Sequence, residues 1–182
     1  MKKAYAAPTV LKPFNKGDRS IVRVVIETPK GSRNKYKFEP KLCSFMLSKV
    51  LPDGMVFPFD FGFIPSTSAE DGDPLDVLLL MDDPAFPGCV IESELIGVIE
   101  GEQVEEGKTV RNDRLVAIAN ENHAYADLKD IKGMNKTLIK DIGQFFTNYH
   151  QLRGSKFKVL GIKGRKQARQ LLEKAVKNNK AA

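Results

Sequence analysis

Short stretches of β-branched or alternating apolar residues dominate the first two thirds of the chain. They predict strands at 21–27, 35–38, 55–64, 76–81, 89–95, 97–100 and 115–119. The stretch 35–38 follows a turn at Gly31 and is a candidate hairpin partner of 21–27, whereas 42–50 stays open between strand and helix. Short strands at such regular spacing favour a small closed barrel over a parallel sheet with crossover helices.

One predicted strand is unusually aromatic. Phe57, Phe59, Phe61 and Phe63 alternate with other residues, and a period of two predicts that one face of a sheet is lined with phenylalanine. Pro58 cannot donate a backbone hydrogen bond, so this strand is expected to be an edge strand or a distorted one.

The last third of the chain changes to helical periodicity. Apolar residues at 3–4-residue intervals predict a helix over 138–152, stopped by Gly154, and a second helix over 165–180. With no repeat, linker or low-complexity stretch, we predict one mainly β, α+β domain over residues 1–182. Residues 1–20 are its N-terminal arm and 165–182 form a basic C-terminal helix.

Composition narrows the class of protein. The chain has 182 residues, 42% hydrophobic and 29% charged, which is typical of a globular protein and not of a disordered one. The sequence contains neither an apolar run of the ~20 residues that a membrane span needs nor a secretory signal. Two cysteines are too few for a disulfide scaffold or a four-ligand zinc site. We therefore predict a cytoplasmic protein without a membrane partner.

The net charge of +6 is unevenly distributed. Residues 153–182 contain ten Lys and Arg against one acid, whereas 70–107 contain twelve Asp and Glu and no Lys or Arg. Crowded carboxylates are unfavourable unless cations neutralise them. The acidic block is either a solvated surface or a place where cations bind.

The most informative segment reads Asp-Gly-Asp-Pro-Leu-Asp, with carboxylates at Asp71, Asp73 and Asp76. A turn of this kind can bring oxygen ligands together, as Mg²⁺ requires. The spacing does not match a calcium-binding EF-hand loop. On spacing alone, an acidic surface turn is an equally simple interpretation.

This segment, followed by Val-Leu-Leu-Leu, resembles the signature of the soluble family I inorganic pyrophosphatases. Other motifs follow in family order: VVIETP at 24–29, KY at 35–36, FPFDFGFI at 57–64, PGCVI at 87–91, LVAI at 115–118 and FFTNY at 145–149. The resemblance implies a closed five-stranded OB-like β-barrel with two flanking helices, and hydrolysis of pyrophosphate assisted by several Mg²⁺ ions. It also implies a homo-oligomer, of two or six subunits.

The resemblance implies roles for nine residues. The implied metal ligands are Glu27, Asp71, Asp76 and Asn112; the implied catalytic base or water-positioning carboxylate is Asp73; and the implied phosphate-binding residues are Lys35, Lys49, Arg114 and Tyr149. Simpler interpretations stay open for three of them. Glu27 is also compatible with a solvent-facing strand end, Lys35 with a solvated basic face, and Tyr149 with packing alone.

The sequence departs from the family pattern at several of these places. Lys37 stands where the family has a glutamate, and strand periodicity turns it to the same side as Lys35. Lys49 replaces an arginine and keeps its charge without the bidentate geometry. Phe61 lacks a tyrosine hydroxyl, and His150, which replaces a lysine, is mostly neutral at pH 7.

The weakest match precedes the strand at 115–119. There Arg114 stands for a lysine, Asn112 stands for an aspartate, and Glu105 or Glu106 is the expected counterpart of a further acid. Asn112 can offer an oxygen to Mg²⁺ but no charge. The neighbouring Asp113 can replace it only with a bulge or a shifted alignment, because on a regular strand it faces the other way.

Three hypotheses follow. The first is a Mg²⁺-dependent enzyme that hydrolyses inorganic diphosphate. The second is a degenerate homologue that binds phosphate or metal with little turnover, or that cleaves another phosphoanhydride. The third is a nucleic-acid-binding barrel, which the basic tail suggests and which the acidic block disfavours because it would repel a phosphodiester backbone. We expect pyrophosphate or phosphate as ligand, and no nucleic acid.

Overall fold

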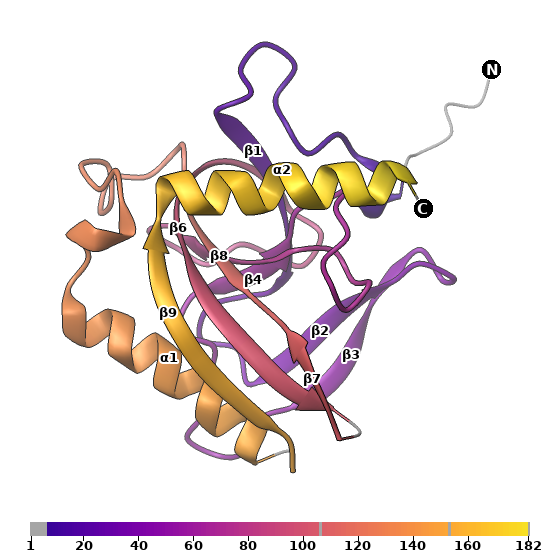
Figure 1. Cartoon of the computed structure of the whole chain (residues 1–182), viewed down its shortest axis with the longest axis vertical. Helices are drawn as coiled ribbons and strands as arrows, with labels where there is room; N and C mark the ends of the chain where they lie inside the picture. Colours follow the sequence, from indigo (N-terminus) through magenta and orange to yellow (C-terminus); the bar gives the residue numbers. More distant parts are fainter. Residues whose placement is uncertain (1–6, 106, 153, 182) are drawn as a thin grey trace.

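A computed structural model describes residues 7–105, 107–152 and 154–181 (Figure 1). The strands are β1 Ile21–Thr28, β2 Asn34–Glu39, β3 Ser44–Val50, β4 Asp60–Phe63, β5 Asp76–Leu80, β6 Val90–Glu105, β7 Lys108–Arg111, β8 Arg114–Ala119 and β9 Lys156–Gly164. The helices are α1 Lys136–Gln151 and α2 Arg165–Ala181, with short 3₁₀ turns at Pro8–Val10 and Ile131–Gly133.

Five strands close into a ring in the order β1, β4, β5, β8, β6 and back to β1. All neighbours in the ring are antiparallel except β5 and β8, which run parallel. The remaining strands of this sheet, β7 and β9, both pair with the long β6, outside the ring. The predicted fold class, a mainly β protein with a closed five-stranded barrel and two helices from the C-terminal region, is confirmed.

The two faces of the barrel sheet carry separate apolar clusters. In β5, Val77 and Leu79 belong to the cluster that includes Leu172 of α2, whereas Leu78 and Leu80 belong to the cluster under α1. This alternation follows from the two-residue period of a strand. Burying each such side chain stabilises the fold by roughly 1.5–3 kcal/mol. Figure 1 shows the two helices packed against different parts of the sheet.

The sequence-based interpretation of residues 34–50 needs a correction. β2 does not form a hairpin with β1 but pairs with β3 in a separate two-stranded sheet, so the segment that was open between helix and strand is a strand. The turn between them includes Cys43, whose positive φ of 47° reverses the chain. The hairpin thereby carries its lysines to the edge of the barrel.

The aromatic strand is also shorter than predicted. It begins at Asp60, because Pro58 lacks an N–H and the buried carboxylate of Asp60 accepts hydrogen bonds from the backbone of Lys30 and Ala85 instead. Phe57, Phe59 and Phe61 join the cluster under α1. Phe63 joins a smaller cluster with Val25 and Phe38, so the four rings do not line a single packed surface.

Two further differences concern the second half of the chain. The strands predicted at 89–95 and 97–100 are one strand, β6, whose register shifts between Leu95 and Gly97 where it pairs with β8. The strands β7 and β9 were not predicted, although Phe157 and Val159 of β9 alternate with lysines. The predicted helices are confirmed, and Gly154 has the positive φ (72°) expected beyond a helix end. Within the described ranges, no helix is long and apolar enough to cross a membrane.

Candidate active site

A polar cavity of about 300 Å³ opens between one end of the barrel, the β2–β3 hairpin and α1. Its lining includes all nine residues to which the sequence analysis gave roles, namely Glu27, Lys35, Lys49, Asp71, Asp73, Asp76, Asn112, Arg114 and Tyr149. These residues lie on five different strands, two loops and one helix. The fold brings these residues together, and their spacing along the chain does not predict this.

The aspartate turn is held by its own backbone. Gly72 takes a φ of 87°, which L residues rarely adopt, and its N–H donates to the carbonyl oxygen of Ala69 at 3.2 Å. The Asp71 carboxylate accepts from the backbone N–H of Asp73 at 3.1 Å. Burial raises the pKa of Asp71; the hydrogen bond from Asp73 opposes this, and the Asp76 and Asp73 carboxylates add to it. A cation in the cavity would relieve that repulsion.

Glu27 does not end its strand in solvent. Its side chain is buried, and its Oε1 accepts a hydrogen bond from the backbone N–H of Phe38 at 2.8 Å. Burial raises the pKa of Glu27 to about 7, against the effect of that hydrogen bond, and the charge of Asp76 raises it further. Burial therefore disfavours the ionised form of Glu27, and a bound cation next to it would stabilise that form.

Lysines of the β2–β3 hairpin form the wall that faces the aspartates. Lys35 and Lys49 lie opposite one another in the register of the hairpin, and both line the cavity. The Lys35 ammonium lies 5.4 Å from the ring centre of Phe61 and 5.5 Å from that of Tyr149. Lys37 also lines the cavity, and its Nζ lies 2.9 Å from Oδ2 of Asp73.

Arg114 is the most deeply buried cation of the site, with 4% of its surface exposed. Its Nη1 lies 2.8 Å from Oδ2 of Asp76, and its guanidinium packs between the rings of Phe146 and Phe157 at 5.4 and 5.7 Å. Its buried Nε has no hydrogen-bond partner. Buried donors without a partner are uncommon in folded proteins.

Helix α1 contributes Tyr149 and His150. Burial raises the pKa of the Tyr149 phenol to about 12, so the phenol keeps its proton and can donate a hydrogen bond at neutral pH. Burial, and after it the charges of Arg114 and Lys35, lowers the pKa of His150 to about 4. His150 is therefore neutral at pH 7, as the sequence analysis predicted.

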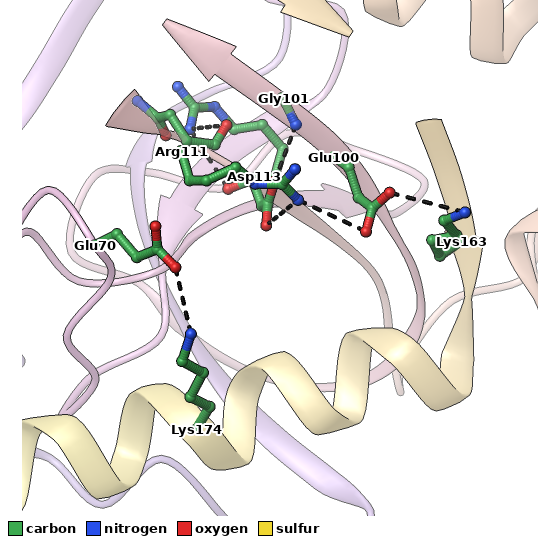
Figure 2. A network of polar contacts seen from close by, with 9 residues as sticks. Glu70, Glu100, Gly101, Arg111, Asp113, Lys163 and Lys174 are labelled. Carbon is green, nitrogen blue, oxygen red and sulfur yellow. Dashed lines mark hydrogen bonds and ion pairs between the residues drawn. The ribbon is translucent and has the colours of Figure 1, made fainter. Parts of the chain in front are cut away.

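The segment 111–114 alternates between two sides. Asn112 lines the cavity, and its Nδ2 donates to Oε1 of Gln103 at 2.6 Å. Asp113 lies on the other side, where its Oδ1 accepts from the backbone N–H of Gly101 at 2.9 Å and pairs with Arg111 (Figure 2). Asp113 therefore does not replace Asn112 at the cavity, because its carboxylate lies with Gly101 and Arg111 outside the cavity lining.

Some lining residues were not predicted as site residues. They are Ser48, Phe57, Gln103, Phe146 and the departures Lys37, Phe61 and His150. The acid expected at Glu105 or Glu106 is not among them; Glu106 lies outside the described residues, as does the side chain of Glu105. Gln103, two residues earlier, faces Asn112 instead. The only feature of the sequence that could have identified Gln103 is strand periodicity, which puts it on the same side of a regular strand as residues 101 and 105.

The donor set suits a hard cation. Four carboxylates and two amide side chains line the cavity, and oxygen donors of this kind are the ligands that Mg²⁺ prefers. Within the described ranges, however, no three His, Cys, Asp or Glu side chains are gathered closely enough to hold a metal ion by themselves. Two of the four carboxylates, Asp73 and Asp76, are already paired with cations of the protein. The residues fit a divalent cation whose remaining ligands come from water or substrate.

Comparison with known proteins adds an independent line of evidence. The family model described as inorganic pyrophosphatase matches residues 24–180. The inorganic pyrophosphatase of Synechocystis sp. is 37% identical over 160 residues, 88% of this chain and 92% of that protein. The inorganic pyrophosphatase of Thermus thermophilus is 36% identical over 165 residues, 90% and 92% of the two proteins.

Solved structures agree with these matches. The crystal structure of the inorganic pyrophosphatase from Thermus thermophilus superimposes with a TM-score of 0.88 at 34% identity, covering 96% of this chain and 99% of that one. The inorganic pyrophosphatase of Helicobacter pylori gives a TM-score of 0.83 at 31% identity, covering 90% and 95%. The similarity therefore extends over the barrel and both helices.

Proposed function

The chain belongs to the family of inorganic pyrophosphatases, and from this premise we propose that its polar cavity is the place where inorganic pyrophosphate is bound and hydrolysed. The protein is a hydrolase that converts pyrophosphate to two phosphate ions. Members of this family depend on metal ions in general, and we propose that the ions used here are Mg²⁺.

One observation carries this assignment of the site. The cavity is lined by four carboxylates (Glu27, Asp71, Asp73 and Asp76) and by four cations (Lys35, Lys37, Lys49 and Arg114). Pyrophosphate is highly anionic, so a water molecule can attack it only where cations neutralise its oxygens. The carboxylates are needed because a site built from lysine and arginine alone would bind pyrophosphate but would not bind a metal ion.

We assign the metal ligands to Asp71, Asp76, Glu27 and Asn112, the oxygen donors that line the cavity around the aspartate turn. When bound, Mg²⁺ would neutralise the substrate and lower the pKa of a coordinated water molecule. Asp73, at the mouth of the cavity, would accept the proton of the attacking water or hold that water in place.

We assign the substrate contacts to Lys35, Lys49, Arg114 and Tyr149. The lysines bring charge, and Arg114 brings a guanidinium that lines the cavity and is held by Asp76 at 2.8 Å. The Tyr149 phenol, with its pKa of about 12, would donate to a phosphate oxygen and not repel it. Donors that are fixed before the charge develops stabilise it most effectively.

The degenerate homologue is not favoured. Its motive was the set of departures at Lys37, Phe61 and Asn112. The cavity nevertheless keeps four carboxylates and four cations, and the relatives named inorganic pyrophosphatases align over most of the chain. We expect the departures to change the metal requirement and not the reaction.

Phosphate release from pyrophosphate and Mg²⁺ tests the assignment. Asp76→Asn keeps the shape of the side chain but removes its charge, and we expect it to lower the rate roughly 100-fold or more. Asp83→Asn makes the same change at an exposed turn outside the cavity and should keep the wild-type rate. A Mg²⁺-dependent rate that is equal in the two variants would overturn the assignment. Circular dichroism confirms that both variants are folded.

We also propose that the protein is a cytoplasmic homo-oligomer. Apolar side chains of β3 that remain exposed in the single chain, those of Met46, Leu47 and Val50, are compatible with a subunit contact. Light scattering coupled to size-exclusion chromatography would show a dimer or hexamer, and a monomer at micromolar concentration would contradict this proposal.

A further inference from the structure

An ion pair inside the cavity links a lysine to the carboxylate that we propose as the base. Nζ of Lys37, on β2, lies 2.9 Å from Oδ2 of Asp73, which is 36 residues away in the aspartate turn. Both side chains are roughly half exposed, so the pair lies at the mouth of the cavity, where a ligand can reach it. The inference drawn from this pair rests on the proposed function.

The surroundings of Lys37 hold it in the charged form. Partial burial disfavours its charge, but the hydrogen bond to Asp73 and the negative charges of Asp73, Glu27 and Asp76 outweigh burial and raise its pKa. Lys37 thus faces three of the four carboxylates of the cavity. A cation in that place neutralises the negative charge of the carboxylates, as a metal ion would, but it belongs to the protein and does not have to be bound from solution.

The position of Lys37 is fixed by the fold. It lies two residues after Lys35 on β2, opposite Met46 in the register with β3, and strand periodicity turns both lysines to the cavity. Lys41 follows four residues later, in the turn of the same hairpin, and lies outside the cavity lining. The hairpin therefore offers one lysine on the site and a matched one away from it.

We propose that Lys37 is an internal cation for Asp73, occupying the place of one divalent ion and reducing by one the number of metal ions that the free enzyme binds. Lys37 is then a positioning residue, which acts through Asp73. It holds that carboxylate in place at the mouth of the cavity while the metal ions bind at the other carboxylates.

Binding of Mn²⁺, a spectroscopic substitute for Mg²⁺, tests the proposal without any substrate. Electron paramagnetic resonance counts the free ion, and titration gives the number of bound ions and their affinities. We expect Lys37→Glu to bind one more Mn²⁺ than the wild type. We expect Lys37→Gln to bind Mn²⁺ about fivefold more tightly, because the Asp73 carboxylate, no longer paired, adds one nearby negative charge in a solvated site. Lys41→Glu makes the same charge change outside the cavity and should match the wild type.

A double-mutant comparison shows whether the effect passes through Asp73. In the Asp73→Asn background, Lys37→Gln should no longer change Mn²⁺ affinity, because the partner carboxylate is absent. An equal number of ions in Lys37→Glu and the wild type would overturn the proposal. So would an equal gain in Lys41→Glu, or a fivefold effect that persists without Asp73. If Lys37→Glu does not fold, the Lys37→Gln titrations decide alone.

This experiment is separable from the test of the proposed function. Phosphate release that fails in the wild type, together with an additional ion in Lys37→Glu, would refute the hydrolase and leave the internal cation in place. Normal hydrolysis in the wild type, together with an unchanged number of bound ions in Lys37→Glu, would support the hydrolase and refute the internal cation.

Discussion

Two polar clusters lie on opposite sides of residues 111–114 and differ in how their charges are compensated. The paired network consists of Glu70, Glu100, Arg111, Asp113, Lys163 and Lys174 (Figure 2). The cavity cluster consists of Lys35, Lys37, Asp71, Asp73, Asp76 and Arg114, with Glu27 and His150 beside it. In the paired network every charged group has a partner of opposite sign.

The cavity cluster is compensated less completely. Glu27 is buried with a pKa near 7, the pKa of Asp71 is raised, and the buried Nε of Arg114 and Nε2 of His150 have no hydrogen-bond partner. A stable fold tolerates such groups where a ligand is to complete them. The comparison teaches that charge density alone does not mark a site, whereas incomplete pairing around a cavity does.

The two arginines of this segment give the largest expected contrast. Arg114 and Arg111 are three residues apart, each paired with an aspartate at 2.8–2.9 Å, but only Arg114 lines the cavity. We expect Arg114→Gln to lower kcat/KM for pyrophosphate on the order of 100-fold, as loss of a fixed donor to developing charge does. Arg111→Gln should change kcat/KM less than about threefold, since Arg111 lies outside the cavity lining.

Steady-state phosphate release measures both variants, and Arg114→Lys separates charge from geometry. Lysine keeps the charge next to Asp76 but loses the second donor, so an intermediate rate is expected. Equal losses in Arg111→Gln and Arg114→Gln would mean that the two sides of the segment do not differ in function.

The two histidines give the next largest contrast, in stability against pH. His150 is buried, with a pKa of about 4, below its ordinary value of 6.5. Between these pH values the unfolded chain binds the proton more readily than the folded one. The stabilisation is therefore complete above pH 6.5 and is lost as the pH falls toward 4. At pH 5 the loss amounts to about 2 kcal/mol.

Urea unfolding at pH 7.5 and pH 5 checks this difference. The wild type should lose about 2 kcal/mol more between the two pH values than His150→Gln does. His123 is fully exposed, and His123→Gln should keep the wild-type dependence. A His150→Gln variant with the wild-type slope would show that other groups cause the acid sensitivity.

Most elements of the fold and part of the candidate site were predictable from the sequence, for physical reasons. The barrel strands are short β-branched runs, and α1 and α2 follow helical periods, so local pattern and final structure agree. The aspartate turn was predictable because Gly72 permits a sharp reversal of the backbone and Pro74 fixes its own φ among three carboxylates. The roles of all nine residues came from resemblance, and they stay predictions although the cavity gathers these residues.

The rest depends on contacts between distant segments. β2 pairs with β3 because the turn after Glu39 reverses the chain, which no pattern before it announces. Gln103 faces Asn112 only because β6 continues past residue 100. The ion pair between Lys37 and Asp73 joins the β2–β3 hairpin to the loop before β5, so the sequence could place Lys37 toward the site but could not name its partner.

The smallest expected effect concerns the neighbours Asn112 and Asp113. Asn112→Asp adds a carboxylate on the cavity side and should tighten Mn²⁺ binding about fivefold, since one more negative charge near the ion is worth about 1 kcal/mol in a solvated site. Asp113→Asn removes a carboxylate of the paired network and should change Mn²⁺ affinity less than about twofold, although it weakens the pair with Arg111. Titration of both variants by electron paramagnetic resonance measures the difference. Weaker Mn²⁺ binding in Asp113→Asn, with none gained in Asn112→Asp, would mean that the metal is held from the network side, contrary to the proposed role of Asn112 as a metal ligand.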